Sequence, residues 1–397
     1  MPFAAALSTA YDTQQALGEA CSHALDRFPG ERPELAVAFF SPHHATAPRE
    51  LAAALHGRLR ARRLIGCIAE AVVGNGREVE HQPALSVWLA GWNGAVQIDA
   101  FHLRAELTPD GPTLFGWPDA LLETDPRRAA MLVLGDPFTF PVTDLFLPRL
   151  AEDLPGLPVI GGMASGAAGP GQTVLLRDDE ALDQGAVGVL LRGPHLWRSI
   201  VSQGCRPIGR PLVVTKGAEN VIAELAGQTP LEYLQALYQE LSPRDQALLT
   251  TGLHIGLVTS EYRESFGRGD FLVRNLLGID RESGALVIAD HVRVGQTVQF
   301  QVRDAATADE DLRALLRSAR AGEAKPAGGL LFTCNGRGTR MFPGPDHDAG
   351  VIQEELGVLP VAGMFAAGEL GPVGGANFIH GFTASVVLFE EASGEKK

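Results

Sequence analysis

Three stretches of the chain repeat the same order of apolar and polar positions. Each has a continuous apolar run, a segment whose apolar residues recur at helical spacing, a second apolar run ending in glycine-rich sequence, and a last apolar run. Such self-similarity indicates one duplicated unit. The opening runs are ELAVAFF from Glu34, AAMLVLGD from Ala129 and GGLLFTCN from Gly328; Ala36 to Gly66 and Met131 to Gly161 each span 30 residues, and Leu330 to Gly363 spans 33.

The repeated pattern predicts a βαββ unit. A continuous apolar run of this length is typical of a strand covered on both faces, and Leu51, Leu55 and Leu59 show the helical spacing that follows. A strand–helix–strand crossover of about 30 residues is right-handed and parallel, and the closing strand returns antiparallel through turns such as Gly74–Gly76. We therefore expect an α+β (mixed α/β) fold in which repeated βαββ units form mixed sheets packed together, with helices on the outside.

The region after Val214 breaks this pattern. A fourth, degenerate copy can start at Gly252, but a loop replaces most of its crossover helix, and the sequence leaves its existence open. A helix is predicted to begin at Pro230 with Thr229 as its N-cap. We expect a first domain of residues 1–217, with two repeats and an N-terminal helix from Thr13 to Phe28. A second domain, residues 218–391, would hold one clear and one degenerate repeat, and the tail 392–397 should fray.

Composition and charge narrow the function classes. The chain has 397 residues, 45% of them apolar and 20% charged, which is typical of a globular protein. Its net charge of −14 argues against nucleic acid and anionic membrane surfaces as partners. The four cysteines lie far apart, as expected for reduced thiols. No apolar run is long enough to span a bilayer, and the N-terminus lacks a secretion signal. We expect a cytoplasmic protein without membrane insertion.

No common cofactor motif is present. The sequence contains no P-loop, and the dinucleotide fingerprint that would start at Gly336 fails because Met341 stands where glycine belongs. Asp346, His347 and Asp348 invite a metal interpretation, but consecutive residues rarely point at one ion, and Asp348 is placed to cap a helix. We expect neither a cofactor nor a metal.

The first candidate binding segment follows the apolar run that opens the third repeat. It contains Cys334, Asn335, Gly336, Arg337 and Gly338, at a strand end where open α/β sheets place their ligands. The two glycines allow successive amides to form an anion-sized nest, and an arginine can grip a carboxylate with its planar fork. The alternative is a flexible turn with solvated arginines.

Further polar residues lie in two other segments. Glu369 is an acid in a glycine-rich, otherwise apolar loop, so it needs a partner if it is buried; Asn377 and His380 follow it. Cys205 and Arg206 form a compact polar corner between the second repeat and the next strand. The alternative for Glu369 is an exposed acid, and for His380 a structural histidine. The alternative for the corner with Cys205 and Arg206 is a simple turn of the chain.

Two other function classes stay open. A cysteine-dependent enzyme would use Cys334 near Arg337, with His347 or His380 as the base, although no Cys–His family signature is present. A non-catalytic scaffold would bind another protein through its glycine-rich loops.

The segments SQGCRPIG, LLFTCNGRGTRMFPGP and PVAGMFAAGELGPVGGANFIHGFTASVVLF resemble the FIST family, the F-box and intracellular signal transduction proteins. The resemblance covers roughly residues 34 to 390. It implies N-terminal and C-terminal FIST halves and a sensory module of bacteria that binds small ligands, with amino acids proposed. The chain has no room for a kinase, cyclase or F-box domain, so any signal would pass to a separate protein or through self-association into a homo-oligomer.

Taken together, the residues and the resemblance predict a cytoplasmic sensor for an amino acid or a similar small carboxylate. Arg337 and the amides of Gly336 and Gly338 would bind its carboxylate, and Glu369 its ammonium group. This prediction depends on these side chains meeting in one place.

Overall fold

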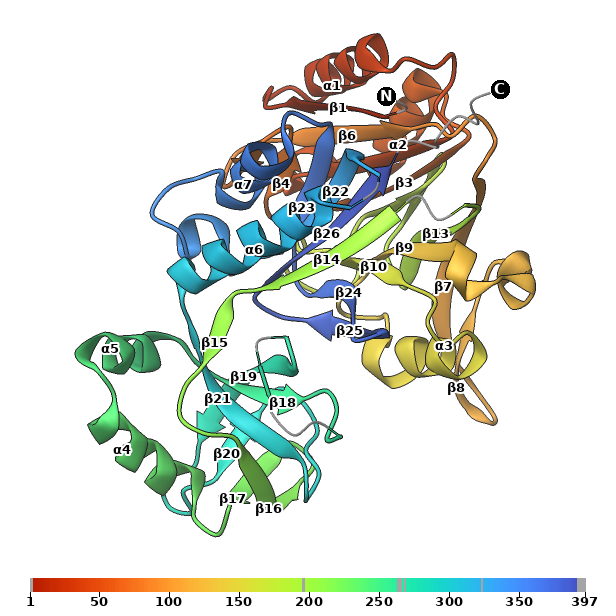
Figure 1. Ribbon diagram of the computed structural model, residues 1–397. Helices are drawn as coiled ribbons and strands as arrows, with labels where there is room; N and C mark the ends of the chain where they lie inside the picture. The colour runs from red at the N-terminus through yellow and green to blue at the C-terminus, as the bar shows by residue number, and fades with distance from the viewer. Residues whose placement is uncertain (1–2, 195–196, 263–265, 268, 323, 391–397) are drawn as a thin grey trace. The chain divides into compact units, whose positions relative to one another are not determined.

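The computed structural model describes residues 3–194, 197–262, 266–267, 269–322 and 324–390 (Figure 1). The chain forms two compact units. The first comprises Met1–Ser202, Leu312–Ile379 and Thr383–Lys397, and the second comprises Gln203–Asp311 and His380–Phe382. The second unit is thus inserted into the first, whereas the sequence division at residue 217 cuts the chain into consecutive halves. The tail predicted to fray lies outside the described residues.

The first unit contains the three predicted repeats. In each repeat the first two strands are parallel, and the closing strand is antiparallel to the first. The mixed sheets and the α+β class are therefore confirmed. The repeats are β2 (Leu35–Phe40), α2 (Pro48–Leu59), β3 (Arg63–Ile68) and β6 (Leu85–Ala90); β9 (Ala129–Gly135), α3 (Leu147–Asp153), β10 (Val159–Met163) and β13 (Ala186–Arg192); and β22 (Pro326–Cys334), α7 (His347–Leu356), β23 (Val361–Ala366) and β26 (Thr383–Glu390).

One glycine occupies the same position in the second strand of each repeat. Gly161 pairs with Val133 on the parallel neighbour and has a positive φ of 146°. A Cβ atom there would lie 1.9 Å from the carbonyl oxygen of Val133, and one at Gly363 would meet Leu331 at the same distance. Gly66 in the first repeat faces a carbonyl in the same way. The glycine therefore allows a close backbone approach that a side chain would prevent.

A short hairpin follows the second strand of each repeat, and it joins the sheet of a different repeat. The hairpin of the first repeat pairs with the third, that of the second pairs with the first, and that of the third pairs with the second. This cyclic exchange ties the three repeats into one body. The hairpins are β4 (Val72–Gly74) with β5 (Arg77–Val79), β11 (Leu175–Arg177) with β12 (Glu180–Leu182), and β24 (Glu369–Val373) with β25 (Ala376–His380).

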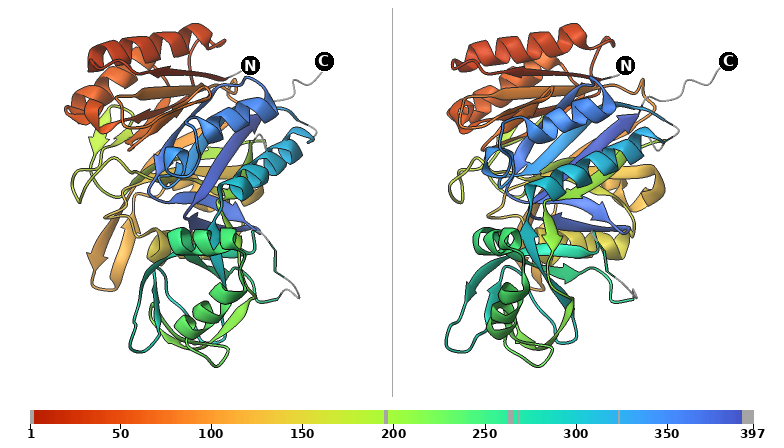
Figure 2. Two further views of the ribbon diagram at one scale, coloured as in Figure 1. Left: turned by 90° about the vertical axis from the view of Figure 1, so that its left-hand side faces the viewer. Right: turned by 60° about the vertical axis from the view of Figure 1, so that its left-hand side comes forward.

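Additional strands and helices complete the three sheets. β1 (Phe3–Ser8) pairs with β6, β7 (Gln97–Thr108) lies between β13 and β8 (Gly111–Phe115), and β14 (Trp197–Gln203) pairs with β26. The N-terminal helix α1 (Thr13–Arg27) matches its prediction. Helices α6 (Ala305–Arg320) and α7 lie along one face of the sheet that contains β22 and β23 (Figures 1 and 2). The inner faces of all three sheets contribute to one apolar core.

The second unit is not a fourth βαββ repeat, so that option is wrong. Every strand pair described in it is antiparallel, and the strands close into a ring because β18 pairs with both β19 and β21. A parallel pair needs a long crossover, which this segment does not supply. The helix predicted at Pro230 is confirmed, with a capping box between Thr229 and Glu232. The elements are β15 (Cys205–Pro207), β16 (Leu212–Ala218), β17 (Val221–Leu225), α4 (Pro230–Glu240), α5 (Pro243–Gly252), β18 (Leu253–Val258), β19 (Phe271–Ile279), β20 (Leu286–Ile288) and β21 (Thr297–Arg303).

Across the described part of the chain, no helix combines the length and the apolar character needed to cross a membrane.

Candidate functional site

A buried ion pair lies at the carboxyl end of β22 in the first unit. Nε of Arg337 donates to Oδ2 of Asp348, and Nη2 donates to Oδ1, both over 2.7 Å. The two side chains are 0% and 1% exposed. The fork that was expected to grip a ligand carboxylate therefore binds a carboxylate of the chain itself. Only Nη1 of Arg337 is left without a hydrogen-bond partner among the described atoms.

Asp348 organises the groups around it. It accepts hydrogen bonds from Oγ1 of Thr333 at 2.6 Å and lies 2.9 Å from Nδ1 of His347. The ring of His347 stacks on Phe342, and the guanidinium of Arg337 lies 5.2 Å from the centroid of the same phenylalanine. The predicted capping role of Asp348 is wrong, because α7 begins after Asp346 and the Asp348 side chain is used by the ion pair. The carboxylate of Asp348 thus holds the side chains of Thr333 and Arg337 in fixed positions.

The start of α7 is capped from another repeat. Oε1 of Glu78, on β5, accepts a hydrogen bond from the amide of Ala349 at 2.9 Å. β5 belongs to the hairpin that the first repeat lends to the sheet of the third, so the exchange of hairpins delivers this carboxyl to the helix N-terminus. Its oxygen thus supplies an acceptor for one of the free amides at the helix N-terminus.

Glu369, the first residue of β24, is a third buried acid at this place. It is 0% exposed, and its Oε2 accepts hydrogen bonds from the amide of Thr383 at 3.1 Å and from Oγ1 of Thr383 at 2.8 Å. The charge of Arg337 and the thiol of Cys334 act on the same carboxyl. The structure thus brings together Cys334, Arg337 and Glu369, as the sequence predicted. We call these three residues, with Glu78, Asn335 and Asp348, the buried polar cluster.

Burial and neighbouring charges divide the acids of the cluster into two kinds. Burial raises the pKa of Glu369 to about 8, against the opposing effects of Thr383 and Arg337. Burial and the charge of Asp348 together raise the pKa of Glu78 to about 8. For Asp348, burial is outweighed by Arg337, which holds its pKa below the usual range. One ionised pair therefore coexists with two acids that carry protons near neutral pH.

The loop between β22 and α7 covers this cluster. Its backbone amides turn inward: the amide of Arg337 donates to the carbonyl oxygen of Cys334 at 2.8 Å, and that of Gly336 to the Cys334 sulfur at 3.4 Å. Gly338 has a φ of 58°, where a Cβ atom would meet Phe365 at 2.7 Å. The predicted glycine nest is therefore a tight turn around its own strand end.

Two acids of the first repeat hold that loop from outside. Glu80 accepts from the amide and from Oγ1 of Thr339, at 3.0 and 2.8 Å, and Glu70 pairs with Arg340. Arg340 also donates to the carbonyl oxygen of Asn335 at 2.8 Å. These contacts lie at the surface, so water competes with them.

Four polar atoms of the buried polar cluster are buried without a hydrogen-bond partner in the described part of the chain. They are Oε2 of Glu78, Oδ1 of Asn335, Nη1 of Arg337 and Oε1 of Glu369. A buried polar atom without a partner costs about 1–3 kcal/mol, so four of them in one cluster are unusual.

The other predicted site residues are placed differently. The side-chain amide of Asn377 accepts from the amide of Val159 at 2.9 Å and donates to the carbonyl oxygen of Leu157 at 2.7 Å, which fixes backbone at the start of β10. His380 is buried and is grouped with the second unit, as are Cys205 and Arg206. Arg206 is paired with Asp304 at 2.8 Å and with Asp245. Neither Asn377 nor these three residues join the contacts described for the cluster.

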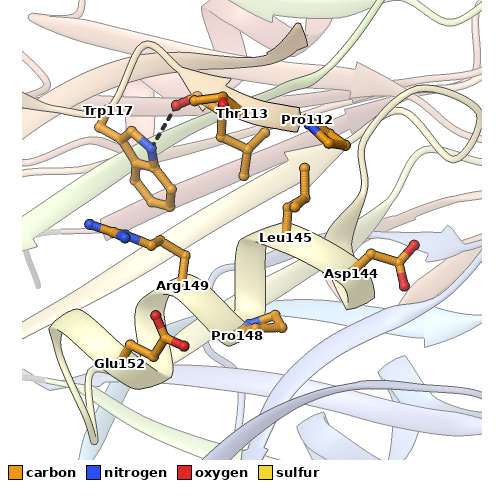
Figure 3. A pocket seen from close by; sticks show the side chains of 9 residues that line it. Pro112, Thr113, Trp117, Asp144, Leu145, Pro148, Arg149 and Glu152 are labelled. Carbon is orange, nitrogen blue, oxygen red and sulfur yellow. Dashed lines mark hydrogen bonds between the residues drawn. The ribbon is translucent and has the colours of Figure 1, made fainter. Parts of the chain in front are cut away.

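A cavity of the first unit lies elsewhere. A groove of about 560 Å³ separates β8 from α3; Trp117 and Arg149 face each other across it, and Asp144 and Glu152 lie along its helical side (Figure 3). The indole of Trp117 donates to the carbonyl oxygen of Leu114 at 3.1 Å. Among the described residues, no group of three histidine, cysteine or acidic side chains is placed to hold a metal ion.

Sequence reasoning missed several members of the site. Glu78 lies in a three-residue strand whose hairpin pairs with β23, almost 300 residues further along the chain, and nothing in its local pattern marks it. Asp348 was considered only as a cap or a metal ligand. The signal that could have found it is its position in the first turn of a helix that follows an arginine-containing loop.

Comparison with known proteins identifies the family of the chain. The FIST N domain matches residues 34–228, and the FIST C domain matches residues 230–372. An uncharacterized protein of Mycobacterium tuberculosis is 46% identical over 384 residues, which cover 96% of this chain and 98% of that protein. An uncharacterized protein of Mycobacterium bovis is 44% identical over 382 residues, covering 96% and 97%. FIST domains are sensory domains of signal transduction that are thought to bind small ligands. The chain therefore belongs to the FIST family.

Proposed function

We propose that this protein is a cytoplasmic sensor that binds a small polar ligand, an amino acid or a similar carboxylate, at the buried polar cluster. The observation that carries the proposal is the gathering of four buried polar atoms without partners around one ion pair. Nη1 of Arg337 offers a charged donor and Oδ1 of Asn335 an acceptor, while the carboxyl groups of Glu78 and Glu369 donate when protonated and accept once ionised. A cluster that contains both donors and acceptors fits a ligand that carries both kinds of group.

The charges set how such a ligand would bind. Arg337 spends two of its donors on Asp348, so a ligand carboxylate would receive one hydrogen bond from Nη1 instead of a bidentate grip. An ammonium group beside Glu369 would favour the ionised carboxylate and would expel its proton. Binding of an amino acid would thus be linked to proton release at neutral pH.

Access to the cluster requires the loop between β22 and α7 to open, because Arg337 and Glu369 are fully buried. Opening would break the hydrogen bonds of Glu80 with Thr339 and the ion pair of Glu70 with Arg340. Opening and closing of this loop would be the conformational signal, read by a separate signalling protein or by a second copy of the chain.

A thermal-shift panel of the twenty amino acids and simple carboxylates tests the proposal. A ligand at a hundred times its Kd stabilises the folded state by about 2.7 kcal/mol, which raises the melting temperature measurably. Glu369→Gln should weaken the binding of any amino acid that is found. Asp136→Asn is the matched control: Asp136 is equally buried at the end of β9, but both its oxygens accept hydrogen bonds, from Thr139 and Thr173 at 2.5 Å.

The outcomes separate clearly. A shift that Glu369→Gln reduces and Asp136→Asn leaves unchanged supports the site. If no compound in the panel shifts the melting temperature, the amino-acid version is rejected. If a compound binds equally well to the Glu369→Gln variant, the ligand occupies another place.

A thiol-dependent enzyme is a second candidate, favoured by one observation. Cys334 is the one described cysteine that is not buried, and it adjoins Arg337 and Glu369. A catalytic thiolate would be alkylated by iodoacetamide at pH 6.5 much faster than an ordinary thiol. Alkylation at the ordinary rate would reject this candidate.

The scaffold alternative predicts that the protein captures a protein partner without any small molecule, and that this binding survives Glu369→Ala.

A further inference from the structure

The groove between β8 and α3 has a fixed aromatic wall (Figure 3). The indole of Trp117 stacks on Phe146, with 5.6 Å between ring centroids and 15° between the rings. Its N–H donates to the carbonyl oxygen of Leu114 at 3.1 Å, and both Phe146 and Leu114 are buried. The indole is therefore held in one position, and its half-buried ring lines the groove together with Leu145.

The helical side of this groove carries more negative than positive charge. Asp144 and Glu152 are exposed, and neither carboxylate forms a hydrogen bond or an ion pair in the described part of the chain. Arg149 lies between them in the sequence, and its Nε is paired with Oδ2 of Asp153 at 2.6 Å, so its charge is already compensated. Two uncompensated carboxylates thus remain beside an apolar wall, which favours a partner with both positive and apolar groups.

The spacing of the two carboxylates limits the shape of that partner. Asp144 lies in the turn Val142–Phe146 directly before α3, and Glu152 lies eight residues further on, in α3 itself. At about 1.5 Å per helical residue, the two positions are roughly 10–12 Å apart along the axis. An extended peptide covers this distance in three residues as a polyproline-type helix, or in four as a strand. In both cases the two side chains lie on the same side of the peptide.

The surroundings of the groove favour a protein segment over a small molecule or a second copy of the chain. Leu107 of β7 and Phe115 of β8 are exposed, so apolar surface continues along the hairpin beyond the groove. β8 is the last strand of its sheet, and no described strand covers it on that side. Apolar surface beside a groove is typical of protein interaction sites. A second copy would bring the same net charge of −14, which repels it.

We propose that this groove binds an extended segment of another protein. The segment carries two arginine or lysine side chains three or four residues apart, with an apolar residue between them. Its basic side chains pair with Asp144 and Glu152, and its apolar residue packs against Trp117 and Leu145. This surface goes beyond the proposed function, because it shares no residue with the buried polar cluster and requires no ligand there.

Fluorine-19 NMR of protein labelled with 5-fluorotryptophan tests this inference, with synthetic peptides as probes. Trp117 is assigned as the signal lost in Trp117→Phe, and the buried Trp88, Trp92 and Trp197 serve as internal references. Each probe has a leucine between two arginines that are two, three, four or six residues apart, and each control peptide has glutamates in place of the arginines. The arginine peptides should move the Trp117 signal saturably, and they should bind most tightly at separations of three and four residues.

Variants of the two acids test the ion pairs. Asp144→Asn and Glu152→Gln should each weaken peptide binding by about two- to fivefold, because each removes one solvent-exposed pair. Glu354→Gln is the matched control, since it changes the net charge equally at an exposed residue outside the groove. Binding should also weaken when the salt concentration is raised from 0.05 to 0.5 M, because salt screens exposed charges.

Four results would overturn the inference, and two of them need no variant. Arginine and glutamate peptides could shift the Trp117 signal alike, or the arginine peptides could leave it unmoved. The double variant Asp144→Asn/Glu152→Gln could bind the arginine peptides as tightly as the unaltered protein does. Argininamide alone could shift the signal as strongly as the peptides do, which would assign the groove to a small cation. A shift caused by raising the protein concentration alone would likewise reject the inference and assign the groove to a second copy.

Discussion

Replacing Asp348 with asparagine tests the central ion pair directly. The substitution keeps the size of the side chain and removes its charge, so the guanidinium of Arg337 stays buried at 0% exposure without a counter-ion. Breaking a buried pair by removing one partner costs about 3–5 kcal/mol, because the remaining charge loses its compensation. Asparagine keeps some of the hydrogen bonds that Thr333 and Arg337 make with Asp348. We therefore expect the lower half of this range, about 3–4 kcal/mol.

Urea unfolding followed by tryptophan fluorescence measures this loss in the right unit. All four tryptophans, Trp88, Trp92, Trp117 and Trp197, lie in the first unit, so their signal reports its unfolding. Glu354→Gln is the matched control, because Glu354 pairs with Arg313 at the surface and is 64% exposed. A surface pair contributes about 0–1 kcal/mol, so the control should change the free energy of unfolding very little.

A double-mutant cycle separates the pair from its surroundings. Arg337→Met removes the cation and keeps an apolar chain, and the double variant with Asp348→Asn leaves no buried unpaired charge. We expect the double variant to lose less stability than the two single losses combined, because neither charge is stranded. The reasoning is refuted if Asp348→Asn costs less than about 1 kcal/mol, which is the range of a solvent-exposed pair, or if the two losses simply add.

Three further perturbations test other parts of the structure. Stability of the unaltered protein should fall between pH 4.5 and about 8, because the buried Glu369 has a raised pKa and keeps a proton that the unfolded chain releases. In Glu369→Gln this fall should diminish, as urea midpoints measured across the pH range would show. An unchanged pH profile would contradict the raised pKa of Glu369. Gly161→Ala should lower the free energy of unfolding by at least about 2 kcal/mol, since its Cβ would lie 1.9 Å from the carbonyl oxygen of Val133. A decrease in urea unfolding below about 0.5 kcal/mol would contradict the close approach of the two strands. Glu80→Ala should change stability by less than about 1 kcal/mol but speed amide hydrogen exchange at Thr339, and unchanged exchange would mean that Glu80 does not fasten the loop.

The repeated units of the first unit were predictable from the sequence, because their signals are local. A continuous apolar run, a helical spacing and a glycine 30 residues later each depend on a few neighbouring residues. Gly161 and its equivalents mark the close approach of two parallel strands within one repeat, so the sequence interval already contains the contact. The capped helix at Pro230 was predictable for the same reason.

The site was only half predictable. The predicted meeting of Arg337 with Glu369 relied on the need of a buried acid for a partner, and the structure places them in one cluster. The partner of Arg337 was not predictable, because an aspartate at the start of a helix serves equally well as a cap. The fourth repeat, which the sequence left open, is not formed, since strands without a crossover helix can pair antiparallel with any suitable neighbour.

By itself, the sequence determined the three βαββ units, their parallel strand pairs and the acids and arginine available near the third one. Only the tertiary structure decided where the short hairpins pair, and thus that Glu78 of the first repeat caps the helix of the third. The physical reason is that a three-residue strand carries too little side-chain pattern to select its partner. Its partner is fixed by the packing of whole repeats around a shared core, which no local stretch of sequence records.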